Sequence, residues 1–343
     1  MKSAVIITII LALSSYSFSQ NKKPLPQDQK TKTVKNTPAD KSQKLENTKS
    51  PEKQTTPFEK ASAMIKSEKA SERKYGAEIL ASLRDPSGVP LLKNLLKDQD
   101  YSVRISAVDA LGALRCYECE KDFSSILSSE KNIQLRQACV IAISYLGRVS
   151  DPSALIAASK PQEDKSLRIS AIRTLGALNV KKAEKDFISY LNKENDSDIK
   201  KALIDALGKM KSQEGLKIIS QYASDQDPSV RQYSLRALGD SGDNSFLDTI
   251  KARLSDDNVS VSLEAALSLA KLSDFSGLEL AHKYLDNKDF SLQNQAMQIA
   301  ALAGNEKTVS IIESKIKESK DENFKAMMEF TKQRILARIK NSK

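Results

Sequence analysis

The chain has 343 residues, 54 Lys and Arg against 44 Asp and Glu, one His and no Trp, and the single histidine excludes most enzymes that rely on imidazole bases or several histidine metal ligands. The net charge of +10 is confined to the ends, because residues 20–57 and 315–343 carry +5 each, residues 1–19 carry +1 and residues 58–314 carry −1. A neutral central part excludes the continuous basic groove of a nucleic-acid-binding protein.

Residues 1–19 have the pattern of a signal peptide. Lys2 precedes the apolar run AVIITIILAL (Ala4–Leu13), and Ser17 and Ser19 provide small residues at the −3 and −1 positions of a cleavage site. The run is shorter than the roughly 20 residues that a membrane-spanning helix needs. We therefore expect cleavage before Gln20 and an exported protein in the periplasm, the cell envelope or the medium, with an uncleaved membrane anchor as the alternative.

Residues 20–57 have the composition of a disordered tether. They are rich in Lys, Pro, Gln and Thr and contain few apolar side chains, so they cannot bury enough apolar surface to offset the entropy of ordering them. The simplest role is a solvated tether. A second possible role is weak, salt-sensitive contact with an anionic envelope surface.

From residue 58 a sequence phrase recurs with a fixed period. The basic residue of "SVR" and its equivalents lie 31 or 32 residues apart: Arg73, Arg104, Arg136, Arg168, Lys200, Arg231, Ser262 and Gln293. A constant period of this size is typical of proteins built from stacked repeats. We call this position the anchor and number other positions of a repeat from it.

The residue pattern within each repeat predicts two helices joined by a short turn. Small or apolar residues at +3, +6, +7 and +10 share one face of a first helix, and apolar residues at +19 and +23 mark a second helix. Position +8 is Gly in four repeats and Ser or Ala in others. Because Gly costs about 1 kcal/mol of helix propensity against Ala, we expect close approach of a neighbouring helix there.

The junctions between repeats have helix-start signals. In Asp227-Pro228-Ser229-Val230-Arg231 the aspartate is placed to cap the helix and the proline to occupy its first turn. The Asp followed four residues later by Arg or Lys suggests a structural ladder of ion pairs between turns.

These features predict an all-α fold, a right-handed α-solenoid of about eight helix-pair repeats over residues 58–343, preceded by the disordered tether. Residues 58–71 and 324–343 are expected to cap its two ends. Met327, Met328, Ile335, Leu336 and Ile339 form the expected apolar stripe of the last helix. Met327 and Met328 could instead contact a partner helix.

The phrase D-x-S-V-R-x-x-A-x-x-A-L-G-x-L at Asp100–Leu114, echoed at 166–178 and 228–239, resembles the bacterial HEAT-like repeat family, whose repeat type also occurs in phycobilin lyases. The resemblance covers about residues 70–320 and implies fold rather than function. Deoxyhypusine hydroxylases with such repeats carry His-Glu pairs, whereas the sole histidine here, His282, precedes Lys283. We accordingly expect neither an enzyme nor a cofactor.

Cys116 and Cys119 form the only motif with possible reactivity, C-x-x-C in a predicted turn. A local disulfide, two plain thiols, and redox or metal chemistry are the three alternatives. Cys139 occupies the +3 core position. His282 lies beside a core position and is expected to be a packing or surface residue.

Tyr190, Tyr222 and Tyr284 all occupy position +22 of the second helix. They could form an aromatic row for partner binding along the inner wall of the solenoid, where we expect the second helices to face. The alternative is that each ring packs within its own helix pair.

The sequence thus favours an exported scaffold that binds a protein of unknown identity on its concave face, acting as a monomer and without nucleic acid. One alternative is an envelope-surface anchor that acts through its basic ends. The other is a subunit or enzyme of a HEAT-like lyase type.

Overall fold

The computed structural model describes residues 55–341, and the predicted signal peptide and nearly all of the predicted tether lie outside them. The described part consists of helices and contains no strand. None of its helices combines the length and the hydrophobicity needed to cross a bilayer.

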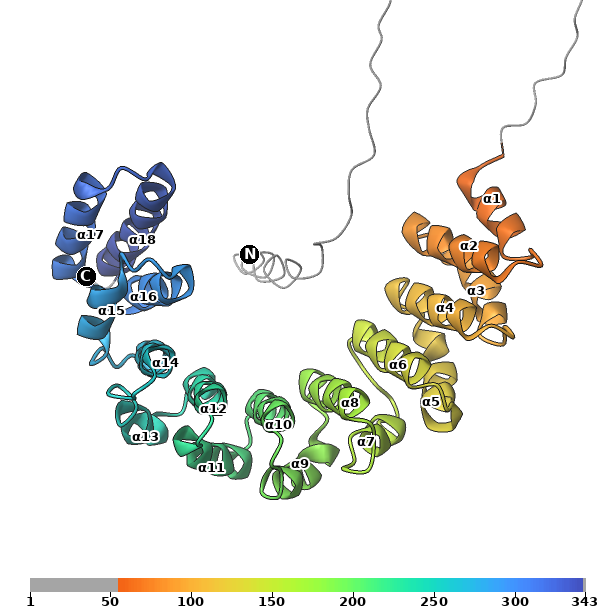
Figure 1. The fold of residues 1–343 in the computed structure, drawn as a ribbon, viewed down its shortest axis with the longest axis horizontal. Coiled ribbons are helices and arrows are strands. Elements are labelled where there is room, and N and C mark those ends of the chain that lie inside the picture. The colour runs from red at the N-terminus through yellow and green to blue at the C-terminus, as the bar shows by residue number, and fades with distance from the viewer. Residues whose placement is uncertain (1–54, 342–343) are drawn as a thin grey trace, which may run out of the picture. The chain divides into compact units, whose positions relative to one another are not determined.

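Eight helix pairs form two rows (Figure 1). The first helices of the repeats are α2 (Ala70–Leu83), α4 (Tyr101–Ala113), α6 (Ile133–Leu146), α8 (Lys165–Ala177), α10 (Ser197–Met210), α12 (Pro228–Ser241), α14 (Val259–Lys271) and α16 (Phe290–Ala303). The second helices are α3 (Val89–Leu95), α5 (Glu120–Ser129), α7 (Ser153–Ala158), α9 (Glu184–Leu191), α11 (Gln213–Gln221), α13 (Leu247–Lys251), α15 (Leu278–Tyr284) and α17 (Glu306–Glu318). The predicted solenoid of eight pairs is confirmed.

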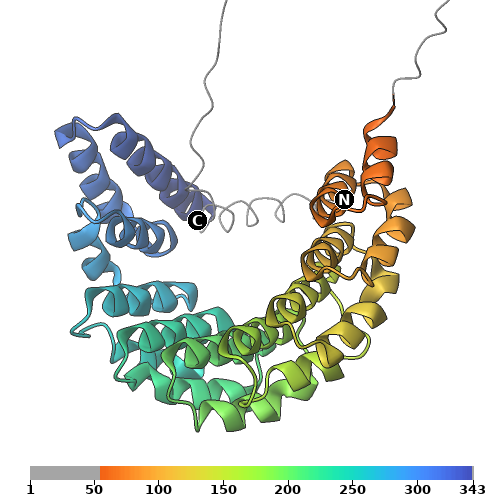
Figure 2. The same cartoon turned by 45° about the vertical axis from the view of Figure 1, so that its right-hand side comes forward.

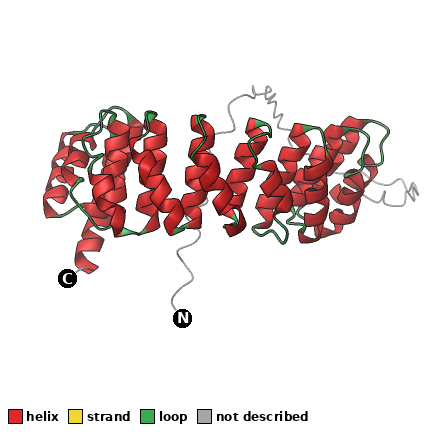
Figure 3. Cartoon of the chain, turned by 90° about the horizontal axis from the view of Figure 1, so that it is seen from below, coloured by secondary structure: helices red, strands yellow, loops and turns green. Residues whose placement is uncertain are grey.

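The first helices line the inside of the arc and the second helices its outside, as Figures 1 and 2 show. Seen from below, the helices of both rows run side by side between two edges made of loops (Figure 3). Consecutive inner helices contact one another from α2 to α16. We call the solvent-facing side of this inner row the inner wall.

The core lies between the two rows. All eight residues at position +19 are buried: Leu92, Phe123, Leu155, Phe187, Ile219, Ile250, Ala281 and Ile312. Residues of α14 belong both to the core of the preceding repeats and to that of the last ones. Each repeat therefore buries its apolar face mainly against adjacent repeats, as a solenoid must.

Glycine at position +8 lets the inner helices approach closely, as the sequence predicted. A Cβ added to Gly176 would lie 2.5 Å from the Cα atom of Ala206 on the next inner helix, and one on Gly239 would lie 2.6 Å from the Cβ atom of Ser268. Real Cβ atoms do not approach so closely, so only glycine fits this spacing.

The junction aspartates cap the inner helices, but they are not the partners of the anchor residues. The Asp227 carboxylate accepts a hydrogen bond from the backbone N–H of Ser229. The predicted ladder of ion pairs between turns is present, but its acids are not the capping residues, because each anchor cation contacts an acid 25 to 27 residues later. These ladder pairs are Arg73–Asp98, Arg104–Glu130, Arg136–Glu163, Arg168–Glu194, Lys200–Asp225 and Arg231–Asp256, with N–O distances of 2.6 to 3.2 Å.

The ladder joins one junction to the next. Arg231 donates to the carbonyl oxygens of Asp225 and Gln226 at its own junction, and to both carboxylate oxygens of Asp256 at the following one. The Asp256 carboxylate in turn accepts from the backbone N–H of Asn258. The ladder stops where Ser262 replaces the anchor cation.

The two ends are closed by single helices. At the N-terminal end, α1 (Pro57–Met64) has a capping box between Thr56 and Glu59 and packs on α2. It is shorter than the expected cap 58–71, because α2 already begins at Ala70.

At the C-terminal end, α18 (Glu322–Asn341) packs on α16 and α17. Met328 and Ile335 are buried there, and Met327 and Ile339 are half-buried. Leu336, which was expected on the same stripe, is 41% exposed, so that prediction is wrong. It lies one residue beyond Ile335, on the side of the helix that has no neighbouring helix to cover it.

Candidate protein-binding surface

Tyr190, Tyr222 and Tyr284 do not lie on the inner wall. Tyr190 and Tyr284 lie on α9 and α15, and Tyr222 directly follows α11 in the short 3-10 turn Tyr222–Ser224. All three helices belong to the outer row (Figure 1). The predicted placement on the concave side is therefore wrong, because the first helices, with their smaller residues, take the inside of the curve.

Two of these tyrosines contact the ladder. The Tyr190 ring lies against the guanidinium group of Arg168 and the Tyr222 ring against the ammonium group of Lys200, each at 5.9 Å from the ring centroid. The Tyr222 hydroxyl also donates a 2.6 Å hydrogen bond to the carbonyl oxygen of Leu191 in the preceding repeat. The two ring–cation contacts lie within single repeats, as the alternative prediction had it, and the Tyr222 hydrogen bond joins its repeat to the preceding one.

Cys116 and Cys119 are joined by a disulfide across the short 3-10 turn Tyr117–Cys119, with their Cα atoms 5.3 Å apart. Both side chains are buried. The bond closes a turn of four residues and links no two repeats. Cys139 is buried in the core, as expected, and burial raises the pKa of its thiol above the ordinary value.

His282 is half-buried on α15, and its Nε2 atom lies 3.0 Å from the hydroxyl of Thr308 on α17. This contact ties two outer helices together. Within residues 55–341 no group of three or more His, Cys, Asp or Glu side chains could hold a metal ion.

The inner wall offers side chains that the core does not use. Position +5 faces it in seven of the eight repeats, and the residues there differ from repeat to repeat: Glu78, Asp109, Ile141, Arg173, Asp205, Arg236 and Gln298. In the seventh repeat this position is Leu267, which is buried in the core. Position +5 was not among the binding sites predicted from the sequence. The sequence signal for a solvent-facing position is the variation of its residues, because a repeat position that packs in the core keeps one kind of side chain.

Two shallow grooves run between inner helices. One of about 490 Å³ lies over α2, α4 and α6, with Asp109, Ile141 and Tyr145 in its lining. The other, of about 360 Å³, lies over α8, α10 and α12, with Arg173 and Tyr233 in its lining. Ile141 and Tyr145 are 43% and 53% exposed, so α6 presents apolar surface to solvent in the first groove.

Most charges of position +5 are neutralised by the wall itself. Glu78 pairs with Lys74 on the same helix, and Asp205 pairs with Lys209 at 2.7 Å. Arg236 forms a two-bond ion pair with the buried carboxylate of Glu264, which raises the pKa of the guanidinium group. No ion pair within 4 Å joins Asp109 or Arg173 to any other described residue.

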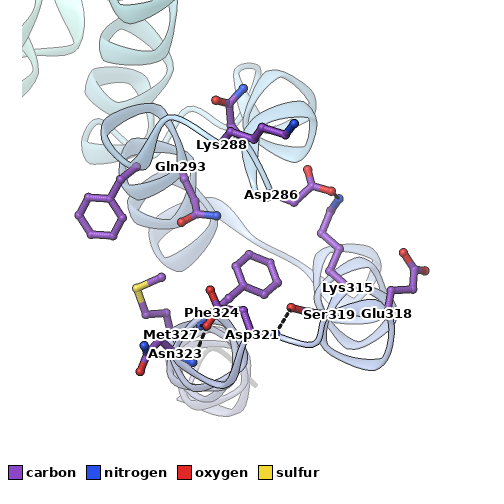
Figure 4. A pocket seen from close by; sticks show the side chains of 12 residues that line it. Asp286, Lys288, Gln293, Lys315, Glu318, Ser319, Asp321, Asn323, Phe324 and Met327 are labelled. Carbon is purple, nitrogen blue, oxygen red and sulfur yellow. Dashed lines mark hydrogen bonds and ion pairs between the residues drawn. The ribbon is translucent and has the colours of Figure 1, made fainter.

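A larger pocket, of about 610 Å³, lies at the edge of the array near its C-terminal end. Figure 4 shows Phe324 and Met327 of α18 facing Gln293 of α16 across it. Gln293 stands where other repeats have the anchor cation, so the pocket occupies the place of a missing ladder pair. Its lining also contains an ion pair between Asp286 and Lys315.

Comparison with known proteins supports the repeat assignment. The sequence model described as HEAT repeats matches residues 59–144, 152–221 and 216–292, more than half of the chain. No curated protein is a significant match.

Several solved structures are similar in fold. Importin beta superposes with a TM-score of 0.63 at 10% identity, over 81% of this chain and 46% of its own. YibA of Escherichia coli gives a TM-score of 0.49 at 17% identity, covering 78% of this chain and 99% of YibA. The complex of CpcE and CpcF of phycocyanin lyase from Nostoc sp. PCC7120 gives a TM-score of 0.42 at 21% identity. That match covers 76% of this chain and 98% of the other. The likeness to importin beta shows the fold alone.

Proposed function

Because this chain belongs to the HEAT repeats family, we propose that it is a non-catalytic, exported scaffold that binds a partner protein on its inner wall. The supporting observation is the contrast between the two sides of the inner helices. One side holds the array together through the core, position +8 and the ladder. The other side carries exposed tyrosines and, along position +5, apolar, polar and charged side chains that vary from repeat to repeat.

A continuous curved wall suits a partner that is itself extended or convex. Exposed tyrosines strengthen the case, because Tyr combines a large contact area with a polar tip and is frequent in protein interfaces. Tyr75 and Tyr145 are 55% and 53% exposed on the inner helices α2 and α6.

Site-specific photo-crosslinking in the producing cells tests the binding side. A photoreactive amino acid would replace Ile141, Arg173 or Gln298 on the inner wall, and in control variants Lys185 or Lys217, exposed residues of the outer helices α9 and α11. We expect one shared crosslinked partner from the inner positions and none from the outer ones.

Deleting residues 20–53 separates this function from an anchor that acts through the basic arm. Crosslinks from the inner wall should persist in that deletion and in high salt, because they depend on the repeats. Crosslinks from the outer positions alone, or loss of all of them on deletion, would show that the inner wall is not the binding surface.

Export has its own measurement, N-terminal sequencing of the protein purified from its producing cells. The cleavage pattern at Ser17-Phe18-Ser19 predicts a mature chain that begins at Gln20. Recovery of the chain with Met1 or Lys2 at its start would contradict cleavage.

A further inference from the structure

The two unpaired charges of position +5 lie in a fixed order along the inner wall. Asp109 on α4 lines one groove and Arg173 on α8 lines the other. Between them α6 contributes the exposed Ile141 and Tyr145. The wall therefore presents a carboxylate, an apolar strip and a guanidinium group in succession.

The surroundings of Asp109 disfavour an unpaired charge. Asp109 is exposed on the inner wall, but its carboxylate shares the groove with Ala110, Ile141, Tyr145 and a second acid, Glu78. Desolvation in this groove raises the pKa of Asp109 above the ordinary value. A cation placed in the groove would offset that cost. The charges of Asp205, Arg236 and Glu78 have partners within the wall and attract a ligand less.

The spacing of the helices sets the length of a matching ligand. Packed helices lie about 8–10 Å apart, so α4 and α8, with α6 between them, are about 16–20 Å apart. An extended chain advances about 3.3 Å per residue. Two ligand charges that reach Asp109 and Arg173 are thus about five or six residues apart.

We propose that the inner wall from Asp109 to Arg173 binds an extended segment of the partner protein that carries a Lys or Arg, then an apolar side chain, then an Asp or Glu about five or six residues from the first charge. The cation lies on Asp109, the apolar side chain on Ile141 and Tyr145, and the anion on Arg173. This inference rests on the proposed scaffold function and specifies the chemistry of its partner.

Selection from a phage-displayed library of random 12-residue peptides, with the purified full chain as the target, tests the pattern. We expect enriched peptides to contain a basic and an acidic residue at this separation with an apolar residue between them. The Asp109→Lys variant should instead enrich peptides with an acidic residue in place of the basic one.

Affinities of one enriched peptide, made synthetically, give the quantitative test. Asp109→Lys and Arg173→Glu should each weaken binding at least about tenfold, since like charges then face each other. A peptide with its Lys changed to Glu should regain affinity for Asp109→Lys, a gain that a misfolded variant could not show. Lys271→Gln, which removes a cation that the wall pairs with Asp240, should change affinity by less than about twofold.

Two results would overturn the inference, and they differ in what they mean for the function. If enriched peptides lack the charge pattern and lose affinity on Gln298→Lys but not on Asp109→Lys, the wall binds peptides at another place and only this inference fails. If no peptide is enriched and the inner positions yield no crosslinks, the scaffold function fails with it.

Discussion

Replacing Asp256 with alanine is expected to lower the free energy of unfolding by about 3 kcal/mol. The carboxylate is 2% exposed and its partner Arg231 is 9% exposed, with an N–O distance of 2.6 Å. Removing the acid leaves a buried guanidinium group without its main counterion. Loss of one partner of a buried ion pair costs about 3–5 kcal/mol, because the remaining charge is desolvated and unpaired. The carbonyl oxygens of Asp225 and Gln226 still accept from Arg231, which places the loss at the lower end.

Asp257 provides a matched control. Its carboxylate lies 2.9 Å from the same Arg231 nitrogen, but its side chain is 92% exposed. Asp257→Ala should cost less than about 1 kcal/mol, as exposed pairs do. Urea unfolding followed by circular dichroism measures the free energy of unfolding of both variants. Equal losses of this free energy in Asp256→Ala and Asp257→Ala would contradict a buried, stabilising Arg231–Asp256 pair.

The pH dependence of the same pair has a definite sign. Burial acts to raise the pKa of Asp256, but the hydrogen bonds from Arg231 and from the backbone N–H of Asn258 outweigh it and hold this pKa below the ordinary value. A carboxyl group with a lowered folded-state pKa adds stability above its unfolded pKa of about 3.9, and this stability is lost as the pH falls through the folded pKa. The difference between wild type and Asp256→Ala should therefore shrink below about pH 4.

The repeat period, the buried positions and the helix caps could be predicted from the sequence because each depends on local spacing. The partner of each anchor could not, since stacking brings together residues 25 to 27 apart. A usable signal was present: an acid precedes most junction caps by two residues, as Asp98 precedes Asp100 and Asp256 precedes Asn258. This second acid has no role in starting the helix, so helix-start signals identify only the cap.

The side of the array that forms the inner wall was predicted wrongly for a physical reason. Helical periodicity identifies the buried face of each helix, but not which row lies inside the curve. The inside row is the one whose helices pack more closely, and residue size decides that. Gly112 facing Ala142, and Gly176 facing Ala206, belong to the first helices. The smaller side chains of the first helices are thus the sequence signal that these helices lie inside the curve, where position +5 faces solvent.

Replacing Gly176 with leucine is the test of that close packing. The first added carbon would lie 2.5 Å from the Cα atom of Ala206 and 2.6 Å from its Cβ atom, so backbone atoms rather than a flexible side chain must move. Overpacking a tight contact costs about 1–3 kcal/mol, occasionally more. The higher helix propensity of leucine stabilises the folded state by up to about 1 kcal/mol relative to glycine. Because three further carbons also need space at this backbone contact, we expect a net loss of about 3 kcal/mol.

Ala177→Leu adds similar bulk one residue away, at an exposed position of the same helix, and should leave the free energy of unfolding within about 0.5 kcal/mol. Small-angle X-ray scattering distinguishes the two variants as well. Forcing α8 and α10 apart on the inside of the curve reduces the curvature, so Gly176→Leu should have the larger radius of gyration. If it unfolded at the wild-type urea concentration with an unchanged radius, close approach of the inner helices would not be what bends the array.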